Sequence, residues 1–92
     1  MLHFLMHGQK DNVAVAVVDV TAGDTAHCLN METDERFDIK ATMDIPLGHK
    51  IALQDLRDGD TVIKYGHDIG RVVAAISKGE HVHVHNLKTK RW

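Results

Sequence analysis

Short apolar stretches alternate with clusters of polar turn residues along the whole chain. Val, Ile and Thr recur in these stretches, and apolar positions that alternate with polar ones favour half-buried strands. We predict strands over residues 3–6, 12–18, 25–31, 36–42, 50–53, 61–65, 71–75 and 81–86. No segment keeps a helical period over three turns, and we expect one short helical turn at residues 54–57. The pattern predicts an all-β fold of short strands, with at most one or two short helical turns.

A turn pattern recurs within this series of strands. In residues 18–25 and 54–61 an apolar residue is followed by a glycine and then by an acidic residue, and residues 75–81 repeat the scheme more loosely. We expect Gly23, Gly59 and Gly79 to have positive φ angles, with the acidic residue starting the next strand. Pro46, the only proline, removes a backbone donor, so we expect a shaped loop before the strand that follows it.

The chain has 92 residues and a formal net charge of −2. This length predicts one compact domain over residues 1–92 with a modest core, which favours a module that completes the site of another protein. Residues 1–60 carry five basic and eleven acidic side chains, whereas residues 61–92 carry six basic and two acidic ones. The basic end includes Lys88, Lys90 and Arg91, which either attract an anionic ligand or an acidic partner, or form a solvated tail.

Cys28 is the single cysteine, so no disulfide can form within the chain and a reducing compartment is expected. It lies in an apolar alternation without a motif around it, and we interpret it as a buried hydrophobic residue rather than a nucleophile. No apolar run approaches the length of a membrane span, and the first residues lack the features of a signal peptide. We therefore expect a cytoplasmic protein whose partners include neither a membrane nor nucleic acid.

Histidine is the outstanding residue type, with eight in the chain. Side chains alternate along a strand, so His81, His83 and His85 are predicted to share one side, where they could converge on a metal ion or an anion. Asn86 follows them with an amide that can orient a hydroxyl or a carboxylate. The alternative is a polar outer face of an edge strand, and the pattern alone does not separate metal from substrate.

Two weaker groups of polar residues accompany this strand. In the first, Gly48 permits close approach, His49 can transfer a proton and Lys50 can hold an anion, although a surface turn explains the same tripeptide. In the second, His7 and Asp11 precede a strongly apolar strand, and a turn before a buried strand accounts for them without any function.

Taken together, these segments resemble the SAF-type small domain of the altronate and galactarate dehydratase family. The resemblance rests on DNVAVA at residues 11–16, GHKIAL at 48–53, YGHDIG at 65–70 and GEHVHVHN at 79–86. The four segments occur in the family's order and cover nearly the whole chain. The galactarate branch keeps the Gly-His-Lys motif but not the histidine-rich strand, so the resemblance points to the sulfolactate or altronate branches.

The resemblance implies a β-clip fold and an iron-dependent elimination from an anionic hydroxy acid. The stand-alone length and the ending at Trp92 look like the small subunit of the two-subunit branch that splits sulfolactate to pyruvate and sulfite with a larger (beta) catalytic subunit. The alternatives are a small subunit of an altronate-type sugar-acid dehydratase and, in another class, a non-catalytic module that binds substrate or metal.

The resemblance also implies roles for individual residues. We expect a divalent metal, Fe²⁺, bound mainly by the large subunit or shared with it, and a hetero-oligomeric assembly. The expected roles are catalysis by His49 and His85, metal contact by His83 and His85, substrate binding by Lys50, Asn86 and Lys88, and lower-grade roles for His7 and Asp11.

Overall fold

The computed structural model describes residues 1–64, 66–83 and 86–88, and these form strands and turns. The strands are β1 (Phe4–Met6), β2 (Val13–Ala16), β3 (Thr25–Asn30), β4 (Arg36–Lys40), β5 (Lys50–Ala52), β6 (Thr61–Lys64), β7 (His67–Val72), β8 (His81–Val82) and β9 (Leu87–Lys88). No helix occurs among the described residues, so the predicted all-β class is confirmed and the helical turn at 54–57 is wrong. Leu56 instead forms an isolated antiparallel bridge with Ile76.

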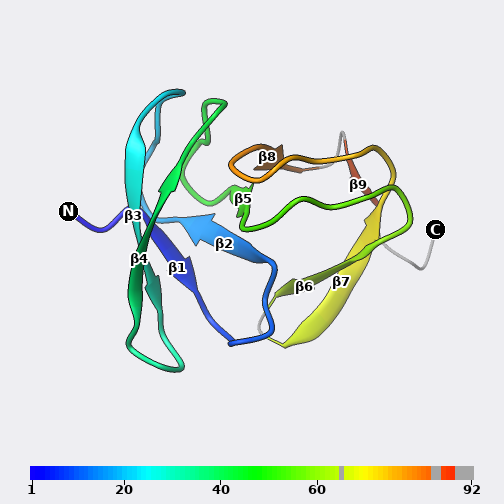
Figure 1. The fold of residues 1–92 in the computed structure, drawn as a ribbon, viewed down its shortest axis with the longest axis horizontal. Coiled ribbons are helices and arrows are strands. Elements are labelled where there is room, and N and C mark those ends of the chain that lie inside the picture. Colours follow the sequence, from blue (N-terminus) through cyan, green and yellow to red (C-terminus); the bar gives the residue numbers. More distant parts are fainter. Residues whose placement is uncertain (65, 84–85, 89–92) are drawn as a thin grey trace.

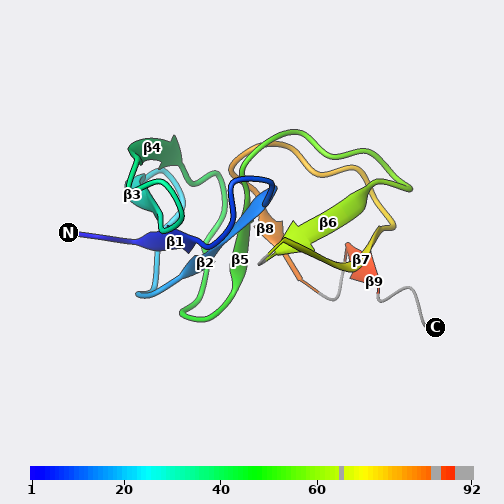
Figure 2. The ribbon, with the colours of Figure 1, turned by 90° about the horizontal axis from the view of Figure 1, so that it is seen from below.

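The strands form two sheets that lie side by side along the long axis of the molecule (Figure 1). One has six strands in the order β4-β3-β1-β2-β5-β8, and the other has three in the order β6-β7-β9. All neighbouring strands are antiparallel except β1 and β3. The view in Figure 2 shows β1, β3 and β4 at one end, the three-stranded sheet at the other, and β2, β5 and β8 between them.

Two hydrophobic clusters explain why the central strands are so apolar. Ala14 of β2 and Ile51 of β5 belong to the first cluster, which also contains Phe4 and lies inside the curl of the six-stranded sheet. The preceding residue of β2, Val13, and the following residue of β5, Ala52, belong to the second cluster, between this sheet and β6-β7. Because neighbouring residues of a strand point to opposite faces, β2 and β5 are buried on both sides.

The recurring turn occurs four times. Its apolar anchors are buried and form two antiparallel bridges, Val20 with Ile45 and Leu56 with Ile76. The glycine three residues after each anchor has a positive φ, which confirms the prediction for Gly23, Gly59 and Gly79 at 92°, 95° and 91°. The fourth copy is the loop at Pro46, where Gly48 has a φ of 84°. That loop leads into β5 as expected.

Two predicted strands have a boundary that differs from the structure by more than two residues. Residues 66–70 were left between the predicted strands 61–65 and 71–75, but β7 already begins at His67 and pairs with β6 through a tight turn at Gly66. The strand predicted over 81–86 ends at Val82, because the backbone turns back and the N–H of Asn86 donates to the carbonyl of His83. Residues 84 and 85 lie outside the described part of the chain.

Candidate functional site

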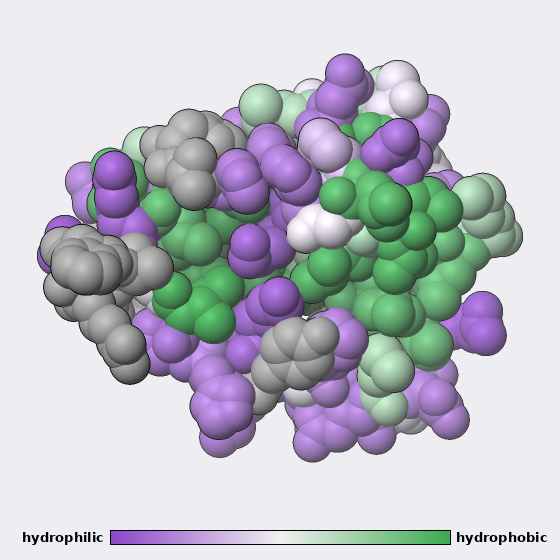
Figure 3. Space-filling view, turned by 180° about the vertical axis from the view of Figure 1, so that it is seen from behind, coloured by the Kyte–Doolittle hydropathy of each residue, from purple (hydrophilic) through white to green (hydrophobic). Residues whose placement is uncertain are grey.

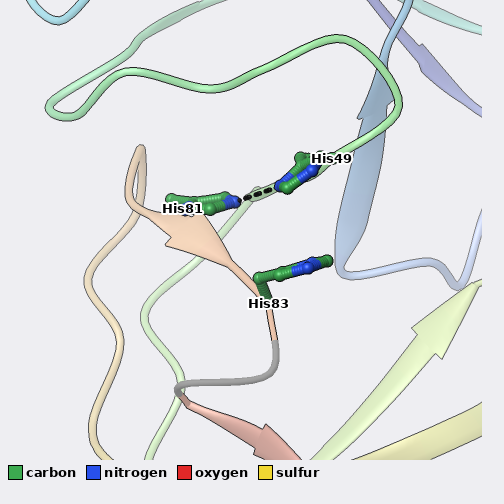
Figure 4. A group of neighbouring side chains, drawn as sticks. All are labelled: His49, His81 and His83. Carbon is green, nitrogen blue, oxygen red and sulfur yellow. Dashed lines mark hydrogen bonds between the residues drawn. The ribbon is translucent and has the colours of Figure 1, made fainter.

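Three histidines from distant parts of the sequence meet at one end of β8 (Figure 4). His49 precedes β5, His81 begins β8 and His83 follows it. One ring nitrogen from each lies within 4.8 Å of the other two. His49 Nδ1 and His81 Nε2 are 2.8 Å apart and share a hydrogen bond. The His49 and His83 rings stack with centroids 4.1 Å apart and planes inclined by 23°.

Strand pairing brings these residues together. Strands β5 and β8 are antiparallel, with Ile51 opposite His81. Residues two apart share a face of a strand, so His49 approaches on the side of Ile51 and therefore on the side of His81. All three histidines are half-buried, so the cluster is accessible from outside while part of each ring is packed.

The turn that carries His49 differs chemically from its three counterparts. In those turns the residue after the glycine is acidic, and its carboxylate accepts a hydrogen bond from the backbone N–H three residues earlier. The pairs are Thr21 with Asp24 (3.4 Å), Arg57 with Asp60 (2.8 Å) and Ser77 with Glu80.

In the fourth turn, Pro46 has no N–H to offer and His49 replaces the acid. The backbone hydrogen bond of the turn is kept, since His49 N–H donates to the Pro46 carbonyl at 2.9 Å, as Asp60 does to Arg57. The side chain at position 49 is thus not needed to close its own turn, and the imidazole reaches the cluster.

Asn86 fixes the segment that carries the other two histidines. Its side chain is only 7% exposed. The amide oxygen accepts a hydrogen bond from the N–H of His83 at 3.0 Å, and the amide nitrogen donates to the carbonyl of His81 at 2.8 Å. Both halves of the amide therefore hold backbone on either side of Val82. A substrate-binding role for Asn86 stays a prediction, beside this structural one.

The cluster fits a divalent transition metal by its donor set. It offers three imidazole nitrogens, and among the described residues no carboxylate or thiolate belongs to the group. Imidazole suits zinc, iron, copper and nickel, whereas magnesium and calcium prefer oxygen ligands. Three protein ligands leave coordination positions open, which is the arrangement of catalytic rather than structural sites. The three histidines could therefore hold a metal ion, whose identity the geometry does not select.

Lys50 lies on the other face of the sheet from His49. It pairs with Val15 of β2 and Val82 of β8, and Val82 belongs to the second cluster. Burial, and then the charge of Lys64, lower the pKa of Lys50. His49 and Lys50 of the Gly-His-Lys motif therefore lie on opposite faces of the sheet, and Lys50 stays a predicted substrate contact. Lys88 is exposed at the end of β9.

Asp11 is buried and holds two turns together. Its carboxylate accepts hydrogen bonds from the N–H of Gly8 at 3.1 Å and from that of Gly66 at 2.8 Å. The next residue, Asn12, bonds Thr61 and Ile63 of β6 and so ties β2 to the second sheet. His7, at the end of β1, is half-buried. The lower-grade site roles of Asp11 and His7 stay predictions.

The sequence pattern placed His81 on the same side of the strand as His83 but did not include it among the expected site residues. Alternation put it beside His83, and only the pairing of β5 with β8 shows that it lies next to His49. Aligning residues 45–49 with the other three turns would have been the available signal, because a histidine stands there in place of an acid. His85, predicted to be catalytic and a metal contact, lies outside the described residues, as do Lys90 and Arg91.

Among the residues that the structure describes, neither Cys28 nor the hollow beside it offers comparable chemistry. Cys28 is fully buried, and burial together with the charge of Asp38 raises its pKa to about 12, so its thiol is not a nucleophile near neutral pH. A hollow of about 560 Å³ lies between β3, β4 and the first residues, and it is lined by His27 and Asp38, among others. These two form an exposed cross-strand pair at 2.7 Å, which contributes little in water.

Comparison with known proteins assigns the chain to a family. The family described as the altronate/galactarate dehydratase SAF domain matches residues 2–90. The chain belongs to this family. Its relatives include a protein named (2R)-sulfolactate sulfo-lyase subunit alpha from Chromohalobacter salexigens, 49% identical over 92 residues that cover 99% of this chain and 98% of the relative. A protein of the same name from Paracoccus pantotrophus is 52% identical over 65 residues, or 71% of this chain and 97% of the relative.

A second group of family members is much longer. The altronate dehydratase of Bacillus subtilis is 40% identical over 89 residues, which are 97% of this chain but only 17% of that enzyme. The likeness to sugar-acid dehydratases is thus confined to one domain, whereas the likeness to the alpha subunits spans both chains.

No helix among the described residues is long and apolar enough to cross a membrane.

Proposed function

We propose that this chain is the small subunit of a two-subunit lyase that splits (R)-sulfolactate into pyruvate and sulfite together with a larger catalytic subunit. The observation that carries the proposal is the similarity, over nearly the full length of both chains, to a relative named as an alpha subunit of that activity. The word subunit in that name supports a hetero-oligomer. A cytoplasmic location remains part of the proposal.

The proposed reaction is a β-elimination. A base removes the proton from C2, the electrons of that bond form the C2–C3 double bond, and the C3–S bond breaks so that sulfur leaves with its electron pair as sulfite. The enol takes up a proton at C3 and becomes pyruvate. Fe²⁺, bound where this chain meets the larger subunit, would supply a Lewis acid for the carboxylate and hydroxyl oxygens of the substrate.

Within this chain, the histidine cluster is the proposed contribution to that reaction. In the metal-free pair, His49 Nδ1 and His81 Nε2 hold one proton between them, which supports the predicted acid–base role of His49. His83 faces the same space and is the proposed contact to metal or substrate. His85 is proposed to act beside it. Lys50, Lys88 and Asn86 are the proposed contacts to anionic and hydroxyl groups.

The proposed partner covers part of the surface of this chain. Figure 3 shows two apolar patches on one face, one over the half of the molecule that holds the six-stranded sheet and one over the half that holds the three-stranded sheet, with polar groups between them. Exposed apolar side chains include Val17, Met31 and Leu47. Contiguous apolar surface rimmed by polar groups is typical of subunit interfaces, which supports a partner without identifying it.

Co-expression with the large subunit tests the proposal. The purified pair is given (R)-sulfolactate, and sulfite and pyruvate are measured in parallel, with each subunit alone as a control. Equal amounts of both products from the pair are expected. Dehydration of altronate without sulfite release would favour the second candidate, a small subunit of an altronate-type dehydratase, which the likeness to the B. subtilis enzyme supports. Absence of turnover of either acid would leave a non-catalytic binding module.

A further inference from the structure

We propose that His49, His81 and His83 form a three-imidazole site for a divalent transition metal that this chain holds without its partner, and that Asn86 is the positioning residue which sets its geometry. The inference deepens the proposed function, because it assigns three ligands of the metal to the small subunit. It makes His81 a ligand, which the alternation pattern only placed beside His83 and which the residue roles implied by the resemblance did not include.

The spacing of the three nitrogens is close to that of a bound ion. Ligand nitrogens about 2.0–2.1 Å from a tetrahedral zinc ion are about 3.3 Å from one another. The cluster has one pair at 2.8 Å and all three atoms within 4.8 Å. To bind an ion, the stacked rings would turn about their side-chain torsions, so that the lone pair in the plane of each ring points at the metal.

A metal ion would replace the proton that His49 and His81 share. In the metal-bound form His49 is a ligand, and this replaces the acid–base role proposed for the metal-free pair. The base of the elimination then comes from the larger subunit or from His85. Because the three ligands are neutral, the ion keeps its full double charge, which attracts a hydroxy acid with two negative groups. The same neutrality disfavours magnesium and calcium, which bind through anionic oxygens.

Asn86 is well placed to preorganise two of the ligands. It bonds the carbonyl of His81 and the N–H of His83 through one buried amide, so the two backbone positions from which these side chains extend are fixed relative to each other. Groups that orient metal ligands typically contribute 10- to 100-fold to metal affinity, on the order expected here. Asn86→Asp keeps an acceptor for His83 but loses the donor to His81, whereas Asn86→Ala loses both.

The test is a titration of the purified full-length chain, without the large subunit, with Co²⁺. Calorimetry gives stoichiometry and affinity, and the visible absorption spectrum reports the coordination of the ion. We expect one Co²⁺ per chain and no heat with Mg²⁺. His81→Ala should weaken Co²⁺ binding by at least about tenfold, and His67→Ala, which changes an exposed histidine outside the cluster, should leave it unchanged.

The two Asn86 variants test positioning. Asn86→Ala should lower Co²⁺ affinity by about 10- to 100-fold and alter the spectrum, with Asn86→Asp in between. Thermal unfolding of each metal-free variant is measured alongside, so that loss of fold is distinguished from loss of geometry. Absence of Co²⁺ binding to the folded chain, or equal binding by wild type and His81→Ala, overturns the inference. Sulfite release by the two-subunit complex would in that case leave the proposed function standing.

Discussion

Two turns of the same backbone shape have different roles in this molecule. The turn at residues 56–60 has a buried anchor, a glycine at positive φ and an aspartate whose carboxylate closes the turn on the N–H of Arg57. The turn at residues 45–49 has the same anchor and glycine, but Pro46 offers no N–H and His49 takes the place of the acid. His49 instead bonds His81.

This comparison separates the scaffold from the site. Three turns use their last side chain to stabilise themselves, and the fourth releases that side chain to a histidine cluster while its backbone hydrogen bond is kept. A carboxylate–amide bond of this kind contributes about 1 kcal/mol. We expect the turn at position 49 to lack about that much local stability, as is typical where a functional site breaks a local rule.

The largest expected effect is the loss of turnover when the cluster is truncated. His83→Ala, and likewise His85→Ala, should reduce sulfite release by the two-subunit complex by at least about 100-fold, or about 2.7 kcal/mol of barrier, because each removes a group next to the reacting acid. Folding of His83→Ala should change by under about 0.5 kcal/mol, because His83 is only half-buried, and the same small change is predicted for His85→Ala. Steady-state rates and urea unfolding of each variant measure the two effects.

Asp60→Ala is the matched control at the scaffold turn. It should cost about 1 kcal/mol of stability through the lost bond to Arg57, while turnover stays within about twofold of wild type. Normal turnover in both histidine variants would remove them from the site, and a large loss of turnover in Asp60→Ala would show that the two turns do not differ as described.

The second effect separates two glycines that occupy the same position in two copies of the turn. Gly59→Ala should lower the free energy of unfolding by about 1–2 kcal/mol, because a residue with a side chain is strained at a φ of 95°. No collision adds to this loss, since the added methyl group meets nothing within 4 Å. Gly79→Ala should cost more, about 3 kcal/mol, since the methyl group would also collide with the carbonyl oxygen of Lys40. Denaturant unfolding compares the two, and equal losses would mean that the contact with Lys40 yields readily.

The smallest effect on stability is expected when the turn at residues 45–49 is converted into a copy of the other three turns. The double variant Pro46→Ser with His49→Asp restores the N–H and the carboxylate found in the other copies. We expect stability equal to wild type or higher by up to about 1 kcal/mol, with metal binding and turnover lost. Thermal unfolding and sulfite release are measured on one preparation, and a destabilised variant would contradict the proposed equivalence of the turns.

The sequence predicted the scaffold better than the site. Glycine followed by an acid is a local signal, and it identified the turns at Gly23, Gly59 and Gly79 correctly. The fourth copy was read only as a shaped loop, because its proline and histidine remove the residues by which the motif was recognised. His81 was left out of the site since its contact with His49 spans 32 positions and depends on strand register.

The same limit applies to Asn86 and Lys50. Alternation extended the last strand to Asn86, but its amide bonds the backbone of His81 and His83 and the strand ends at Val82. Local sequence cannot show that a side chain turns back on its own segment. The sequence neighbours His49 and Lys50 were grouped as one motif, whereas strand pairing places them on opposite faces.

The central claim is that the cluster of His49, His81 and His83 faces the pocket that a larger subunit completes. A crystal structure of the two-subunit complex with a bound substrate analogue measures this directly. The account predicts a metal ion or a carboxylate of the analogue within bonding distance of these imidazoles, under cover of the partner. Imidazoles open to solvent and remote from the bound acid would contradict it.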